Sequence, residues 1–424
     1  MKKTYFSLFF VLALGFWSCQ KDEDVETTGI LKGTVTAWST SSALDDVKIT
    51  VFESNSNTPV QSLTTAADGT YSAVLEPGSY YLRMYRNGYE QVPPRNISPI
   101  PFTVFLREEL ENSVEMFDSE VERGGYIQGT VSEAGKAVPN ALVVGEKDGK
   151  GYSTVSDAEG NYFLYNLPAG DFHLKAWISG YESEHTTVSV AAATKNEHNI
   201  LVTQGATGTV LGTVSFLAST AVEVDVTLTH PLTQEPIPGL KTSTTADYSI
   251  QNVPTGIFLA RATYRNDERV VDPDWIVKFG EPMVEVGGGP VNRDFSLTNA
   301  LKVMSPTNLP SNTIPSEING LTPTFSWEAY PSASDYVVEV SDANGRVIWG
   351  GIDRTQSIPV KNITIPSSQT SVTFNDDGTA TQPLEPGKVY RWRVFVSKDD
   401  KQSASGWRLI SVSEDQLGLI KIAR

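Results

Sequence analysis

The sequence predicts an all-β protein, built from tandem antiparallel β-sandwich domains arranged as beads on a string. Short segments alternate apolar and polar residues: in residues 172–176, Phe172 and Leu174 share one face while His173 and Lys175 share the other. Glycine and proline turn signals separate such segments at intervals of about eight to twelve residues, and helical periodicity is almost absent. The length of 424 residues favours roughly two to four domains of about 100–200 residues each.

Residues 1–18 have the features of a secretory signal peptide. Lys2 and Lys3 precede an apolar run over residues 5–17 that is too short to span a bilayer as a helix. Cys19, the only cysteine in the chain, follows directly. This arrangement resembles the lipoprotein signal of Bacteroidetes-type bacteria, which implies acyl chains on Cys19 as the contact with the outer membrane. The alternative is an ordinary signal peptide with an incidental cysteine.

Residues 19–28 are expected to form an acidic tether. Lys21, Asp22, Glu23 and Asp24 follow the cysteine, and a lysine with acidic neighbours at this place resembles the surface-export signal of the same lipoproteins. The resemblance implies an outer-membrane lipoprotein that faces the cell exterior. A solvated acidic tether on a protein that faces the periplasm is the alternative.

Three successive segments repeat one pattern and predict three domains, at residues 29–121, 122–203 and 204–299. Each opens with Gly-Thr-Val, then has an alternating strand, then a turn that leads into a tyrosine, then a second turn with Gly. The openings are Gly33-Thr34-Val35, Gly129-Thr130-Val131 and Gly212-Thr213-Val214, and the tyrosines are Tyr71, Tyr162 and Tyr248. Asp-Gly and Pro-x-Gly turns allow a chain to reverse between strands.

This repeat resembles the carboxypeptidase regulatory-like domain, which implies a seven-stranded, prealbumin-like β-sandwich. The second repeat matches best, with Gly160-Asn161-Tyr162 and Leu167-Pro168-Ala169-Gly170 at the expected places. The third is degenerate, because it lacks the turn glycine before Tyr248 and the later Gly-Tyr pair. In metallocarboxypeptidases this domain is an accessory, and nothing in the chain resembles their catalytic domain.

Residues 300–424 are expected to form a different module. Trp327 lies in one alternating segment, and Tyr390 opens the pattern Tyr-x-Trp-x-Val in another. These segments resemble a fibronectin type III domain, which implies that Trp327 lies in the core with Tyr390 near it.

Composition and motifs exclude several functions. A formal charge of −17 argues against nucleic acid as a partner. We find no nucleophile elbow, paired-histidine zinc motif or phosphate loop, and the acidic turn at Asp376-Asp377-Gly378 lacks the spacing of a calcium loop. Gly287-Gly288-Gly289 reads as a hairpin between two strands. We therefore expect a non-enzymatic protein without cofactor or metal; a hydrolase with an unrecognised site is the weaker alternative.

Four aromatic residues are the candidates for contact with a ligand. The alternation places Trp177 on the face opposite Phe172, and Tyr80, Tyr81 and Tyr85 crowd one hairpin of the first repeat. Exposed rings would suit a glycan, whereas packing against a neighbouring domain is the competing interpretation. The leading functional hypothesis is a lipid-anchored surface protein that binds or scaffolds a partner, with a glycan or a surface protein as candidates.

Overall fold

The computed structural model describes residues 27–54, 58–94, 99, 101–119, 121, 124–205, 207–217, 220–263, 268–309, 314–343, 345–414 and 417–423. The predicted all-β class is confirmed: strands form two facing groups of sheets in each of four successive regions, called domains 1 to 4 below. Among the described residues there is one α-helix, α1 (Pro273–Phe279), and no helix has the length and apolar character needed to cross a bilayer.

Domain 1 contains two sheets. The first has the order β4-β1-β7, with β8 also on β1, and consists of β1 (Gly29–Ala37), β4 (Thr70–Leu75), β7 (Glu109–Glu111) and β8 (Val114–Met116). The second has the order β3-β2-β5-β6 and consists of β2 (Lys48–Glu53), β3 (Thr58–Thr64), β5 (Gly78–Tyr85) and β6 (Phe102–Val104).

Domain 2 repeats this arrangement. One sheet has the order β10-β9-β18-β15 with β13 and β17 also on β9: β9 (Gly125–Glu133), β10 (Lys136–Ala137), β13 (Asn161–Leu167), β15 (Tyr181–Ser183), β17 (Lys195–Glu197) and β18 (Ile200–Gln204). The other has the order β12-β11-β14-β16: β11 (Leu142–Lys147), β12 (Lys150–Val155), β14 (Gly170–Trp177) and β16 (Thr186–Val190).

Domain 3 has the same two sheets with an insertion. The first has the order β22-β19-β27-β24, with β26 on β19: β19 (Gly208–Phe216), β22 (Asp247–Val253), β24 (Arg269–Val271), β26 (Pro290–Asn292) and β27 (Phe295–Asn299). The second has the order β21-β20-β23-β25: β20 (Val224–Thr229), β21 (Pro236–Thr244), β23 (Gly256–Thr263) and β25 (Met283–Val286). The insertion, between β23 and β25, contains β24 and α1.

Domain 4 has a different topology. A small sheet, β28-β30-β36, contains β28 (Val303–Ser305), β30 (Thr324–Trp327) and β36 (Ser371–Thr373). It is accompanied by the large sheet β29-β39-β37-β31-β32, with β35 on β31 and β38 on β37: β29 (Ser316–Ile318), β31 (Asp335–Asp342), β32 (Val347–Gly350), β35 (Ile365–Pro366), β37 (Val389–Asp399), β38 (Trp407–Val412) and β39 (Leu419–Ile422). A two-stranded ribbon joins β33 (Ile352–Asp353) to β34 (Val360–Lys361). Trp327 and Tyr390 are both buried in its core.

The Gly-Thr-Val segments have a shared structural cause. In domains 1 to 3 the final stretch of chain runs parallel to the first strand as two short strands, with an irregular step between them. The step brings a backbone carbonyl against the glycine. A Cβ there would lie 2.2, 1.7 or 2.1 Å from the carbonyl oxygen, at Gly33, Gly129 and Gly212 respectively. Glycine is therefore required by close approach of the backbone.

The same step explains the repeated threonine and tyrosine. The tyrosine hydroxyl donates to the carbonyl oxygen at the step, in the pairs Tyr71–Asn112, Tyr162–His198 and Tyr248–Arg293. The threonine amide donates to the next side chain, in the pairs Thr34–Ser113, Thr130–Asn199 and Thr213–Asp294. Domain 3 keeps all three contacts, so its sequence degeneracy affects the turns and not this step.

The glycine-rich segment 287–289 differs from the expected hairpin. β25 pairs with β23 in one sheet of domain 3, whereas β26 pairs with β19 in the other. The segment therefore carries the chain from one sheet to the other instead of reversing it within a sheet.

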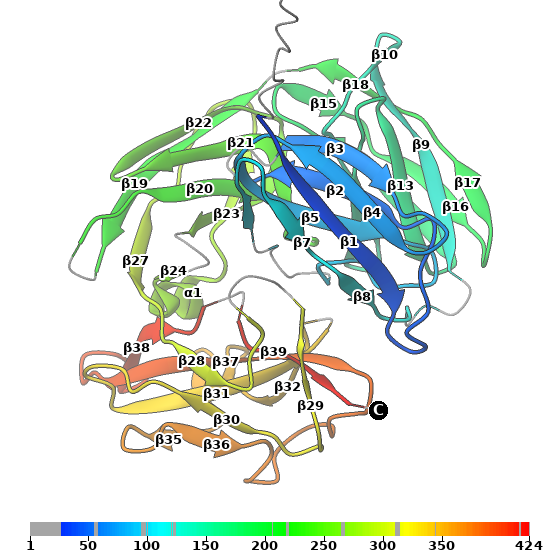
Figure 1. Ribbon diagram of the computed structural model, residues 1–424. Helices are drawn as coiled ribbons and strands as arrows, with labels where there is room; N and C mark the ends of the chain where they lie inside the picture. The colour runs from blue at the N-terminus through cyan, green and yellow to red at the C-terminus, as the bar shows by residue number, and fades with distance from the viewer. Residues whose placement is uncertain are drawn as a thin grey trace, which may run out of the picture.

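The domains also differ from separate beads. Domains 1 to 3 lie side by side above domain 4 (Figure 1), and the core of domain 3 includes Leu142, Val144 and Trp177 from domain 2. A further apolar cluster joins domain 3 to domain 4 through Val270, Val277, Phe395, Leu409 and others. Neighbouring domains therefore cover outer faces of the sheets, and the tandem sandwiches pack against one another instead of standing apart as separate beads.

Candidate functional site: the interdomain surfaces

The three candidate tyrosines lie on β5 and are all buried. Tyr80 faces the core of domain 1 with Leu82 and Met84, and its hydroxyl donates to the carbonyl of Glu76 at 2.8 Å. Tyr81 and Tyr85 point to the opposite face. The prediction that these rings are exposed is wrong: Tyr80 packs in the core of domain 1, and domain 3 covers the outer face of β5, where Tyr81 and Tyr85 lie.

Between Tyr81 and Tyr85 lies Arg83, which pairs with Glu235 of domain 3. The two side chains are only 3% and 8% exposed. Burial raises the pKa of the Glu235 carboxyl, and Arg83 opposes that rise. The guanidinium carbon also lies 5.7 Å from the ring centre of Tyr81. A charged pair removed from water in this way is strongly sensitive to loss of either partner, so it couples domain 1 to domain 3.

Trp177 closes the contact between domains 2 and 3. The alternation along β14 is as predicted, with Trp177 on the outer face, but the ring is only 5% exposed. It meets Phe258 edge to face at 5.5 Å, and Gly256 leaves room for it, since a Cβ there would lie 2.8 Å from the indole. The ammonium of Lys175 lies 4.0 Å from the ring centre. Of the two interpretations of Trp177, interdomain packing is the one that fits.

A histidine–carboxylate pair lies beside Trp177. His230 of domain 3 is 2% exposed, and its Nε2 lies 3.1 Å from Oε1 of Glu146 in domain 2. The hydrogen bond with His230 lowers the pKa of Glu146. Nearby, Thr255 N–H donates to the Glu182 carboxylate at 2.5 Å. These contacts make the interface between domains 2 and 3 both apolar and polar.

Domains 1 and 4, which are separated in sequence, also touch. Trp38 Nε1 donates to Glu317 at 3.1 Å, and Lys421 Nζ donates to the same carboxylate at 2.9 Å. The Lys421 ammonium lies 3.1 Å from the ring centre of Trp38 and 4.6 Å from that of Phe117. Domain 1 thus contacts both domain 3 and domain 4, and domain 3 contacts domain 4, so these three domains form a closed ring.

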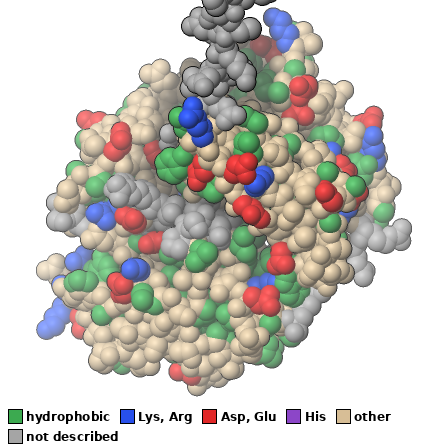
Figure 2. Space-filling view, viewed as in Figure 1, with side chains coloured by type: hydrophobic (Ala, Val, Ile, Leu, Met, Phe, Trp, Pro, Cys, Tyr) green, Lys and Arg blue, Asp and Glu red, His purple; other side chains and the backbone are tan. Residues whose placement is uncertain are grey.

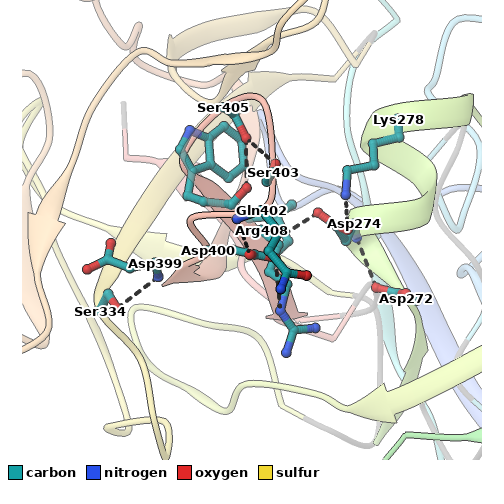
Figure 3. A network of polar contacts seen from close by, with 12 residues as sticks. Asp272, Asp274, Lys278, Ser334, Asp399, Asp400, Gln402, Ser403, Ser405 and Arg408 are labelled. Carbon is teal, nitrogen blue, oxygen red and sulfur yellow. Dashed lines mark hydrogen bonds and ion pairs between the residues drawn. The ribbon is translucent and has the colours of Figure 1, made fainter.

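Helix α1 contributes polar contacts between domains 3 and 4 (Figure 3). Asp272 caps its first turn by accepting from Asp274 N–H at 3.0 Å, and Pro273 occupies the first helical position. Asp274 then accepts from Leu409 N–H of β38 at 3.1 Å and from Lys278 at 2.6 Å. Burial raises the pKa of Asp272.

Two cavities flank this helix. A cavity of about 300 Å³ is lined by the ring of Trp275 together with Thr213, Ser215, Asp272, Asp294 and Ser296. Its two carboxylates each accept a backbone N–H, Asp294 from Thr213 and Asp272 from Asp274. Asp294 also occupies the place that Ser113 and Asn199 hold in the other repeats, where each side chain accepts a hydrogen bond from the threonine amide.

A larger cavity, of about 420 Å³, lies between domains 3 and 4. Arg261, Arg354, Arg391 and Arg393 contribute to its lining. Sequence reasoning missed this group. The alternation of β37 was the available signal, because it places Arg391 and Arg393 on the face opposite the core residues Trp392 and Val394.

Other sequence predictions concern the N-terminal segment, metal binding and the acidic turn. Cys19, Lys21, Asp22, Glu23 and Asp24 lie outside the described residues. Within the part of the chain that the structure describes, no cluster of His, Cys, Asp and Glu could hold a metal ion. The carboxylate of Asp377 instead accepts from Trp349 Nε1 at 2.8 Å and from Thr379, which fixes its turn.

The comparisons with known proteins concern the first two domains above all. Residues 30–100 and 126–203 match the model of the carboxypeptidase regulatory-like domain, so domains 1 and 2 are similar to this domain. No curated protein matches the chain.

Three solved structures are among those that the chain matches. The Bacillus anthracis TIE protein is 19% identical, with a TM-score of 0.19 over 64% of this chain and 51% of its own, so this chain spans about half its length. The shaft pilin SpaA from Lactobacillus rhamnosus GG is 11% identical, with a TM-score of 0.20 over 42% and 98%. The Streptococcal ancillary pilin is 13% identical, with a TM-score of 0.19 over 41% and 62%. Such scores carry no functional argument.

Proposed function

We propose that the protein is a non-enzymatic, lipid-anchored scaffold on the outer surface of the cell. The observation that carries this proposal is that prominent charged and aromatic side chains are buried between domains. Arg83, Glu235 and Trp177 are all committed to contacts between domains. These distinctive residues therefore join the domains to one another. A body of joined domains that presents several faces suits a scaffold or a binding protein.

The anchor rests on the sequence around Cys19, the only cysteine of the chain. Two acyl modifications on Cys19 would hold the protein at a membrane, since each CH₂ group buried in the bilayer contributes about 0.8 kcal/mol. The charge of −17 would keep the body away from anionic lipid headgroups. In this proposal domain 4 is a fibronectin type III-like module.

Labelling cells with a radioactive or alkyne-bearing fatty acid tests the anchor. We expect label on the wild-type chain and none on Cys19→Ser, which should leave the membrane fraction. Equal label on both proteins, or none on either, contradicts lipidation.

The outward orientation has a separate test. Protease added to intact cells should digest the wild type, whereas replacing Lys21, Asp22, Glu23 and Asp24 by alanine should protect the protein within the periplasm. Digestion of both to the same extent contradicts an export role for these residues.

A second candidate, carbohydrate binding, is favoured by the cavity beside α1. The Trp275 ring lies there among hydroxyls and carboxylates, a combination that can stack on a sugar ring and bond its hydroxyls. A glycan array with the chain from Gln20 onward tests it. We expect binding that Trp275→Ala abolishes and Trp177→Phe retains; no binding, or equal binding by both variants, contradicts this function.

A further inference from the structure

We propose that the cavity between domains 3 and 4 binds a small organic oxyanion, a ligand with a carboxylate or phosphate group on a compact body. The cavity is about 420 Å³ in volume, which lies within the range of about 300–1,000 Å³ typical of small-molecule sites. This inference does not depend on where the protein is anchored.

Both domains build the walls. Domain 3 contributes β23, β24 and α1, with Leu259, Val270 and Ile276 among the lining residues. Domain 4 contributes β31, β37 and β38, with Phe395 and Val412. Apolar side chains from both sides can hold the body of a ligand, while the polar groups select its charge.

The charge of the lining is opposite to that of the protein. Among the described residues of the lining, four arginines face two glutamates, Glu281 and Glu339, with no lysine or aspartate. This is a formal excess of two positive charges in a chain whose net charge is −17. On the face shown in Figure 2, acidic and basic side chains are scattered and form no basic patch. The described lining of the cavity therefore has a local excess of positive charge.

The arginines are placed where their charge is effective. Arg261, Arg391 and Arg393 are half-buried, and only Arg354 is exposed. Interactions between charges strengthen when water is partly removed. A guanidinium also presents a rigid fork of donors that matches the oxygens of carboxylate and phosphate groups.

One arginine is fixed before a ligand arrives. Arg393 Nε donates to Glu339 at 2.7 Å, and its guanidinium carbon lies 5.0 Å from the ring centre of Phe395. The Glu339 side chain is only 7% exposed. Since an ordered side chain loses less conformational entropy on binding, this arrangement favours a ligand. Arg393 is thus ordered at the cavity wall by Glu339 and Phe395.

Titration calorimetry and ligand-observed NMR on the chain from Gln20 to Arg424, which contains every described residue, test the proposal. The probes are glucuronate, glucose 6-phosphate and, as the neutral control, glucose. We expect at least one of the two anions to bind and glucose not to bind. Binding of glucuronate alone identifies a carboxylate ligand, and binding of glucose 6-phosphate alone identifies a phosphate ligand.

Variants connect the binding to the cavity. Arg261→Gln and Arg354→Gln should each weaken binding, which raises the dissociation constant at least tenfold. Arg408→Gln removes the same charge at the same junction but outside the cavity lining, so it should change the constant less than twofold. Circular dichroism and melting temperature verify that each variant is folded. The proposal is overturned if neither anion binds at millimolar concentration, if glucose binds equally well, or if all three variants bind as the wild type does.

Discussion

Removal of Glu235 is the sharpest test of whether the domains stay in contact in solution. Glu235→Leu leaves Arg83 charged at a site where the side chain is 3% exposed. Breaking a buried ion pair by removing one partner costs about 3–5 kcal/mol. We expect a loss of that size in the free energy of unfolding, measured by urea titration with tryptophan fluorescence as the signal.

The double variant separates a buried charge from lost packing. Arg83→Leu with Glu235→Leu removes both charges and leaves apolar groups of similar size. Such replacements are often neutral or stabilising by about 1–4 kcal/mol, so most of the loss should be recovered. The matched control is Glu109→Leu, which breaks the exposed pair with Lys32 and should cause no resolvable change.

One result would refute this reasoning. If Glu235→Leu destabilises the protein by less than about 1 kcal/mol, the value expected for an exposed pair, Arg83 is hydrated in solution. Domains 1 and 3 would then not be held together as described.

Three further predictions concern other contacts. Trp177→Ala should lower the free energy of unfolding by about 3–5 kcal/mol, because it leaves a cavity between domains 2 and 3; an unchanged urea midpoint would mean that the ring is not buried. Gly129→Ala places a Cβ 1.7 Å from a carbonyl oxygen and should cost about 1–3 kcal/mol, whereas Gly287→Ala, with nothing within 4 Å, should melt close to the wild type. The third follows from the lowered pKa of Glu146 beside His230: its contribution is present at neutral pH and is lost as the pH falls below about 4.5. Urea unfolding at pH 7 and pH 4 should therefore show a smaller pH dependence for Glu146→Gln, and an identical dependence would contradict this origin.

The sequence predicts the faces of the strands well but not what covers them. Alternation along β14 correctly separates Phe172 from Trp177, and the repeated Gly-Thr-Val segments locate the first strand of each of domains 1 to 3. What alternation cannot supply is the partner of an outward face. Arg83 and Glu235 are 152 positions apart, and no local pattern links them. An outward aromatic therefore looks the same in sequence whether it meets a ligand or another domain.

The missed arginines illustrate the same limit. Arg391 and Arg393 occupy the polar face of an ordinary alternating strand, for which solvent is the usual neighbour. Their meaning depends on domain 3 being placed opposite them. The sequence of β24 and α1 is largely apolar and does not indicate that these elements lie opposite the arginines of domain 4. Residues 264–267, between β23 and β24, lie outside the described part of the chain.

The contact of Trp38 with Glu317 and Lys421 limits how far the domains can extend from the N-terminus. Four sandwiches in a line would extend a partner-binding surface far from a membrane, with a height fixed by the contour of the chain. Because the first and fourth sandwiches touch, the four domains do not form such a line, and a protein held at Cys19, as proposed above, would keep its modules nearer to the bilayer. The height at which it presents a surface would then depend on the contacts between its domains and not on the length of the chain.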